Sequence, residues 1–179
     1  MALTATIYNL SVELADIDRG VYEKLDVCIA RQPSETIEYM FMRVIAYCLE
    51  YGDGIVLTQG VAAGNEPAVL VRDLTGRMTA WIEVGMPDPE RLHRGLKLAG
   101  RAAVYTHRDV QKVLAQLSAA GIDRLSAVPV YEFNRSFVDQ IAGLIERRST
   151  LSISVTQREL YLEIRGRTFT ATIVEHRAE

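Results

Sequence analysis

One predicted β-hairpin constrains this chain more than any other feature of its sequence. Segments 66–73 and 77–85 both carry apolar, strand-favouring residues. Between them, Asp73-Leu74-Thr75-Gly76 places Asp and Gly where a tight turn favours them. A short turn of this kind brings the two strands together as an antiparallel pair.

If Leu74 and Thr75 form a two-residue loop, Glu66 and Glu83 lie opposite each other at the open end of the hairpin. Opposed side chains lie about 5 Å apart on one face of a sheet, where two carboxylates repel each other. A divalent cation relieves that repulsion, and Mg²⁺ prefers oxygen ligands of this kind. The pair therefore predicts a metal site formed by Glu66 and Glu83.

Other readings of the same residues lead elsewhere. A type I turn with a bulge would slip the register by one residue and move Glu83 off the face that it shares with Glu66, although a second bulge could restore it. The residues also allow Glu66 to be a loop residue and Glu83 to cap the helix that follows Pro87. The sequence leaves these alternatives open.

The hydrophobic pattern predicts a mixed α/β chain around this hairpin. We expect the N-terminal hairpin and the C-terminal strands to form a second, antiparallel sheet, and we expect Ser34 to cap the first helix. Further strands are predicted at 2–13, 21–31, 54–60, 102–106, 125–131, 150–156, 158–164 and 168–175. Helices are predicted at 34–51, 87–101, 108–119 and 135–147.

Composition narrows the function classes. Apolar residues make up 49% and charged residues 24%, as in ordinary globular proteins. The 20 Lys and Arg residues against 23 Asp and Glu residues give a net charge of −3, which argues against a strongly basic nucleic-acid binder. Two cysteines are too few for a disulfide scaffold, and no apolar run is long enough for a membrane span. We therefore expect a cytoplasmic protein that does not enter a membrane.

Several stretches resemble the YaeQ family of small bacterial proteins, nearly from end to end and with the spacing kept. They are Met1-Ala2-Leu3 with Ala5-Thr6-Ile7-Tyr8, Ala30-Arg31 with Pro33-Ser34-Glu35-Thr36 and Glu38, Glu66-Pro67, and Trp81-Ile82-Glu83 with Gly85 and Pro87.

The resemblance implies a fold. That family resembles a variant of the PD-(D/E)xK nuclease fold, whose core consists of a helix, three antiparallel strands, a second helix and a further strand. The same order is predicted between residues 34 and 106. The resemblance thus implies one domain over residues 1–179, with a nuclease-like core at about 34–147 and an accessory sheet built from 2–31 and 150–176.

The resemblance also implies site residues. Glu66 stands where the first acid of such nucleases is expected, and Glu83-Val84-Gly85 stands where the (D/E)xK tripeptide is expected. Glu35 or Glu38 would be the helix carboxylate. The implied cofactor is Mg²⁺ or Mn²⁺. Gly85 departs from the pattern, because it occupies the position of the lysine that orients water and stabilises developing charge.

Arginines on the helix after Pro87 are the candidates to replace that lysine. We place Arg94 first and Arg91 second, because both flank the apolar stripe of the helix close to Glu83; Lys97 comes third. An arginine stabilises phosphoryl charge well, but it stays protonated and is a poor general base.

Two functions follow from these observations. The first is a metal-dependent phosphodiesterase that acts on DNA or RNA, so that a nucleic acid is the partner. The alternative is a non-catalytic interaction or regulatory module that kept the nuclease core and lost the lysine. Gly85 and the acidic net charge favour the alternative.

Overall fold

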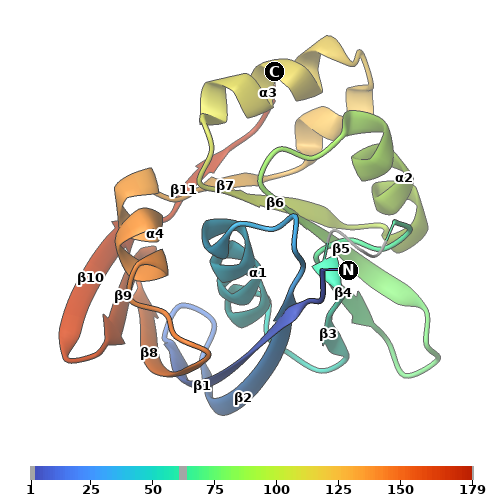
Figure 1. The fold of residues 1–179 in the computed structure, drawn as a ribbon. Coiled ribbons are helices and arrows are strands. Elements are labelled where there is room, and N and C mark those ends of the chain that lie inside the picture. Colours follow the sequence, from blue (N-terminus) through green and yellow to red (C-terminus); the bar gives the residue numbers. More distant parts are fainter. Residues whose placement is uncertain (1–2, 61–63, 179) are drawn as a thin grey trace.

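The computed structural model describes residues 3–60 and 64–178. These residues form four α-helices and two β-sheets (Figure 1). Among the described helices, none is long and apolar enough to cross a lipid bilayer.

The first sheet unites the two ends of the chain, as expected. Its order is β10-β9-β8-β1-β2. The sheet is mixed and not purely antiparallel, because β1 and β8 pair in parallel. More than a hundred residues lie between these two strands, so the connection is long enough for the crossover that a parallel pair requires. The strands are β1 (Thr6–Asp16), β2 (Val21–Arg31), β8 (Arg148–Thr156), β9 (Glu159–Ile164) and β10 (Arg167–Thr172).

The second sheet has the order β11-β7-β6-β5-β4-β3. The β3-β4-β5 unit is antiparallel, whereas β5, β6 and β7 are parallel. The predicted strand 168–175 is divided: β10 ends the first sheet and β11 joins the second. The strands are β3 (Ile55–Leu57), β4 (Val69–Arg72), β5 (Met78–Val84), β6 (Ala102–Thr106), β7 (Val130–Glu132) and β11 (Val174–His176).

The helices are α1 (Ile37–Leu49), α2 (Pro89–Ala99), α3 (Val110–Ala119) and α4 (Arg135–Ala142). The expected order of α1, three antiparallel strands, α2 and β6 is present. Thr36, and not Ser34, caps α1: its side chain accepts a hydrogen bond from the backbone N–H of Tyr39, whereas Ser34 lies in a preceding turn. The predicted strand 125–131 is a short 3₁₀ helix, Asp123–Ala127, followed by β7.

Helix α1 lies between the two sheets (Figure 1) and contacts strands of both. Nine of its thirteen side chains are buried, and the apolar ones among them belong to the larger hydrophobic core, which also receives residues from both sheets and from α4. A smaller core on the other face of the second sheet is formed with α2 and α3. The central strands of the second sheet, β5 and β6, are therefore buried on both faces.

The hairpin register differs from the prediction. Leu70 faces Trp81 and Val69 faces Ile82, and a bulge lies between Val71 and Arg72. The turn is also wider than two residues, because the Asp73 N–H donates to the Arg77 carbonyl. These two irregularities shift the register by two residues. Glu66 precedes β4 and does not face Glu83, so the predicted cross-strand pair of carboxylates is wrong.

The absence of a side chain at Gly95 allows helix α2 to pack closely against Trp81 of the second sheet. A Cβ atom at this position would lie 2.2 Å from the buried indole of Trp81. We expect Gly95→Ala to lower the free energy of unfolding by about 1–3 kcal/mol through overpacking, although alanine favours helices. Urea unfolding followed by far-UV circular dichroism measures this.

Gly143→Ala is the matched control, because the nearest atom to its added Cβ would be an ordinary 3.5 Å away and its φ is −71°. We expect a change within about 0.5 kcal/mol. Equal effects at Gly95 and Gly143 would contradict the close-contact explanation.

Candidate functional site

Glu83 is the buried acid of the candidate site. It lies near the carboxyl end of β5, and only 5% of its surface is exposed. Its Oε1 accepts a hydrogen bond of 2.8 Å from the indole N–H of Trp81 and one of 2.9 Å from Nε of Arg91. The Glu83 carboxylate is therefore held by an arginine from the first turn of α2.

Arg91 joins three segments. Besides its ion pair with Glu83, its Nη1 donates to the carbonyl oxygen of Gly64 at 3.2 Å and its Nη2 donates to the carbonyl oxygen of Glu66. Its guanidinium carbon lies 5.9 Å from the ring centre of Trp81. Asp88 caps α2 by accepting from the Arg91 backbone N–H. The loop before β4, strand β5 and helix α2 thus meet at one guanidinium group.

The Glu83 carboxyl experiences opposing effects. Burial raises its pKa, whereas the hydrogen bond and charge of Arg91 and the hydrogen bond from Trp81 lower it; the net direction is upward. Arg91, with a smaller contribution from Trp81, thus keeps the pKa of the buried Glu83 carboxyl from rising further.

Gly85 occupies the expected lysine position in a conformation that disfavours lysine. Its φ is +84°, in the left-handed region that side chains other than glycine rarely adopt. A Cβ there would lie 3.4 Å from Cε2 of Tyr39. Burial, followed by the charge of Glu83, raises the pKa of Tyr39 to about 12, so its phenol stays neutral at physiological pH. A neutral aromatic ring therefore borders the position where a lysine was expected.

Glu35 belongs to a second ion pair, with Arg43 of α1. Both side chains are fully buried, and Arg43 Nη1 lies 3.1 Å from each carboxylate oxygen of Glu35. Arg43 also donates to the carbonyl oxygens of Ala30 and Thr58. A Cβ at Gly60 would lie 2.1 Å from Glu35 Oε1, so the Gly60 backbone closes over the pair. This geometry stabilises the fold; the predicted catalytic role of Glu35 gains no support from it.

The other predicted residues are more open. Glu38 is half-buried on the first turn of α1, and Glu66 is half-buried in the loop before β4. Arg94 and Lys97 are exposed on α2, so Arg91 is the basic residue that contacts Glu83. Over residues 3–60 and 64–178, no three His, Cys, Asp or Glu side chains are close enough together to hold a metal ion.

Arg43 and Tyr39 were missed by the sequence analysis. Arg43 is the only charged residue between Tyr39 and Leu49, in an otherwise apolar helical run. A single charge at a core-facing position requires a buried partner, and that signal could have indicated Glu35. Nothing comparable marks Tyr39, because the contact that brings it to the site is with Gly85, which directly follows a distant strand.

Arg91→Met tests the electrostatics of Glu83. Without the guanidinium, an ionised Glu83 is buried without a cation, and its already raised pKa rises further. Above that pKa the penalty is fully present, and below it protonation relieves the penalty. We expect a loss of about 1–3 kcal/mol at pH 8, reduced because Arg91 is partly exposed, and a smaller loss at pH 5.

Urea unfolding at both pH values measures these losses. Arg94→Met is the control, since Arg94 is exposed on the same helix, and we expect a change within about 0.5 kcal/mol at either pH. A loss in Arg91→Met that does not depend on pH would contradict the assignment.

Arg43→Met should be among the most damaging single substitutions, with a loss of about 3–5 kcal/mol in the free energy of unfolding, because it leaves the Glu35 carboxylate buried without its cation. Adding Glu35→Gln should recover part of that loss, because it removes the negative charge that is buried without its arginine. Chemical denaturation of the two variants tests this. A double variant less stable than Arg43→Met alone would contradict the ion-pair explanation.

Comparison with known proteins identifies the family. A family model described as YaeQ protein matches residues 1–173. The uncharacterized protein YaeQ of Escherichia coli (strain K12) is 29% identical over 164 residues, and that of Salmonella typhi is 27% identical over 163 residues. Each alignment covers 90% of both chains.

Two crystal structures share the fold. The YaeQ protein from Pseudomonas syringae has a TM-score of 0.90 at 26% identity and covers 98% of this chain and 97% of its own. The YaeQ protein from Xanthomonas axonopodis pv. citri has a TM-score of 0.88 at 25% identity, covering 98% of this chain and 100% of its own. With its sequence matched over nearly the whole length and the fold shared, this chain belongs to the YaeQ family.

Proposed function

We propose that this chain is a non-catalytic interaction module on a nuclease-like fold, in which an arginine takes the place of a metal ion. The single observation that carries the proposal is the contact of Arg91 with Glu83, at 2.9 Å. A buried carboxylate requires a compensating positive charge, and here a side chain of the protein supplies it.

The contact removes the main reason for a metal to bind. A metal ion at Glu83 would have to displace Arg91, which also holds the carbonyl oxygens of Gly64 and Glu66. Displacement would therefore cost three interactions. Arg91 cannot replace the metal in activating water, because a guanidinium does not coordinate water as a Lewis acid and, since it stays protonated, cannot accept a proton from water either.

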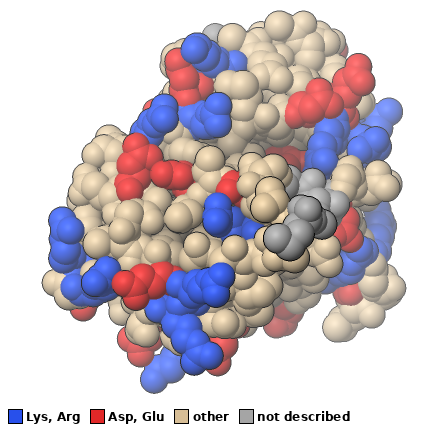
Figure 2. Space-filling model, viewed as in Figure 1, with Lys and Arg blue, Asp and Glu red and all other residues tan. Residues whose placement is uncertain are grey.

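Gly85 supports the same conclusion. Catalysis by such nucleases depends on the lysine that orients water. At position 85, a lysine would require a left-handed backbone. Surface charge agrees as well: on the face shown in Figure 2, acidic and basic side chains alternate and do not form one continuous basic surface. A nucleic-acid backbone is bound by clustered positive charge.

A metal-dependent phosphodiesterase remains the second candidate. One observation favours it: in the described part of the chain, neither the Glu66 carboxylate nor Oε2 of Glu83 accepts a hydrogen bond. Under this proposal Glu66 and Glu83 would bind Mg²⁺ or Mn²⁺, Glu35 or Glu38 would complete the acidic set, and Arg91 or Arg94 would stabilise charge on a DNA or RNA phosphate.

Calorimetric titration of Mn²⁺ into the wild-type protein distinguishes the two functions. It is paired with incubation of the protein with single- and double-stranded DNA and RNA in the same metal. We expect no saturable site and no cleavage, because Arg91 already neutralises Glu83. A saturable site or cleavage that disappears in Glu83→Gln and persists in Glu90→Gln, an exposed acid on the same α2 helix, would overturn the interaction module in favour of the phosphodiesterase.

A further inference from the structure

The first sheet ends in an unpaired strand. Strand β10 pairs only with β9, and no other strand of the described chain lies on its far side. We propose that this edge of β10 binds an extended peptide segment of a partner protein, which adds a sixth strand to the sheet. The inference concerns a different surface from the Glu83 site and does not depend on how that site functions.

The backbone of β10 presents a regular row of free groups. Arg165 and Gly166 form a two-residue turn with positive φ at both positions, so Ile164 and Arg167 are the hydrogen-bonded pair that closes it. Hydrogen-bonded positions then alternate along the strand. Phe169 and Ala171 therefore direct their N–H and C=O groups toward β9, and the Ile173 N–H, which donates to the Arg158 carbonyl, continues this phase.

The alternate residues of β10 are three threonines, Thr168, Thr170 and Thr172. Their backbone groups point away from β9, and within the described residues these groups form no hydrogen bond. An extended peptide could satisfy them, as in peptide recognition by strand addition.

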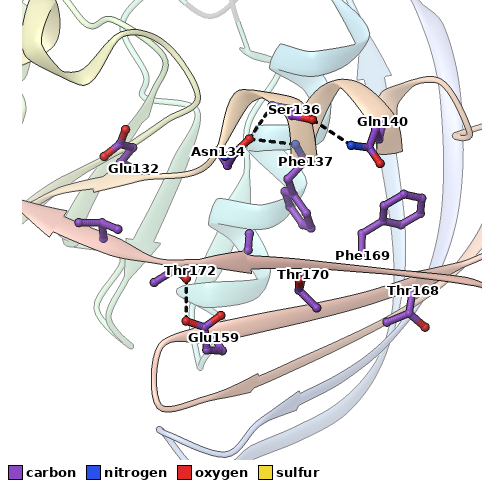
Figure 3. A pocket seen from close by; sticks show the side chains of 12 residues that line it. Glu132, Asn134, Ser136, Phe137, Gln140, Glu159, Thr168, Phe169, Thr170 and Thr172 are labelled. Carbon is purple, nitrogen blue, oxygen red and sulfur yellow. Dashed lines mark hydrogen bonds between the residues drawn. The ribbon is translucent and has the colours of Figure 1, made fainter.

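A groove lies beside this edge, between β10 and α4. We call it the β10 groove. Its volume is about 630 Å³, within the range of small-ligand pockets. Figure 3 shows Phe137 of α4 and Phe169 of β10 facing the space between their elements, with the polar side chains of Asn134, Ser136 and Gln140 along the helix. Side chains of a bound strand point alternately to its two faces, so apolar ones could contact the two phenylalanines and polar ones the polar side chains of α4.

Edge strands usually carry features that prevent pairing with other chains. Strand β2, at the opposite edge of the same sheet, carries exposed Glu23, Lys24 and Asp26. Strand β10 has neither Pro nor Lys, and Arg167 at its start is its only charge. Threonine also favours strand conformation. Compared with β2, strand β10 carries fewer features that prevent pairing, which indicates that its edge is available to a further strand.

The charge of the β10 groove indicates which charge the partner peptide carries. Its lining contains no lysine or arginine and two carboxylates: Glu132, whose Oε2 lies 2.8 Å from Nε2 of His176, and Glu159. Glu159 accepts a hydrogen bond from Thr172, so the acidic end lies at the carboxyl end of β10. The expected ligand is a strand of alternating β-branched residues with a Lys or Arg at the end that meets Thr172.

Selection of a displayed random peptide library on the immobilised protein tests the proposal. The peptides should have about eight residues, within the usual range of strand lengths. Binders to Ser136→Trp protein are first removed, because Trp on this exposed groove position should block entry without disturbing the core. We expect enriched peptides with alternating β-branched residues and a terminal basic residue. Failure to enrich any peptide that depends on the open groove would overturn the proposal.

The enriched peptide is then synthesised and titrated by NMR. On binding, amide exchange should slow at Thr168, Thr170 and Thr172, while Phe169 and Ala171 are already protected in the free protein. Thr170→Pro removes one outward N–H and should weaken binding at least tenfold, whereas Thr170→Val keeps that N–H and should not. Replacing the basic residue of the peptide by Glu should also weaken binding.

Two results of the titration would overturn the inference: amide protection on binding that does not follow this alternation, or unchanged peptide binding to Thr170→Pro. A third result would be slow amide exchange at the three threonines in the free protein, together with the sedimentation mass of a dimer. The last result would show that a second copy of the chain occupies the edge. Mn²⁺ titration reports on Glu83 and not on β10, so failure of this inference is separable from failure of the proposed function.

Discussion

The buried ion pair between Glu35 and Arg43 is the interaction on which the rest of the structure depends. Arg43 lies at the centre of α1 and donates to Ala30 at the end of β2 and to Thr58 just after β3. One guanidinium therefore connects the central helix to both sheets. Fully desolvated charges are costly, and here every contact of Arg43 serves to fix the position of α1. The N-terminus of α1, with Tyr39, takes its place beside β5 as a result.

The second ion pair, between Glu83 and Arg91, uses the same principle nearer the surface. Its arginine comes from a capped helix and also holds the loop before β4. The charges of both pairs act on Tyr39, whose pKa is raised by burial first and then by Glu83 and Glu35, and lowered by Arg43 and Arg91. Two of the acids that the sequence associates with metal binding, Glu35 and Glu83, are thus each paired with an arginine, and these pairs are what the proposed non-catalytic role rests on.

Much of the fold could be predicted from local sequence, because helix starts, turns and apolar periodicity are local properties. The order of α1, β3 to β5, α2 and β6 is an example. The register of the β4–β5 hairpin could not, since the bulge between Val71 and Arg72 and the wider turn together move it by two residues. The parallel pairing of β1 with β8 joins segments far apart in the chain, and no local pattern encodes its direction.

The candidate site, like the fold, could be predicted from the sequence only in part. Glu83 and Arg91 are both candidates in the sequence; the sequence places Arg94 before Arg91, and in the structure Arg91 contacts Glu83 whereas Arg94 is exposed. The sequence does not indicate Arg43 as a site residue, since its partner, Glu35, precedes the helix and is itself a predicted catalytic carboxylate. In each case the deciding information is a tertiary contact between two elements whose separate patterns are clear.

Trp81 has a consequence of its own. It is the single tryptophan of the sequence, it is fully buried, and its indole N–H is bonded to the Glu83 carboxylate. All tryptophan emission of the protein therefore originates at the candidate site. Its wavelength and intensity are a built-in optical signal of whether the carboxylate, the arginine and the indole are still together, without any label attached to the chain.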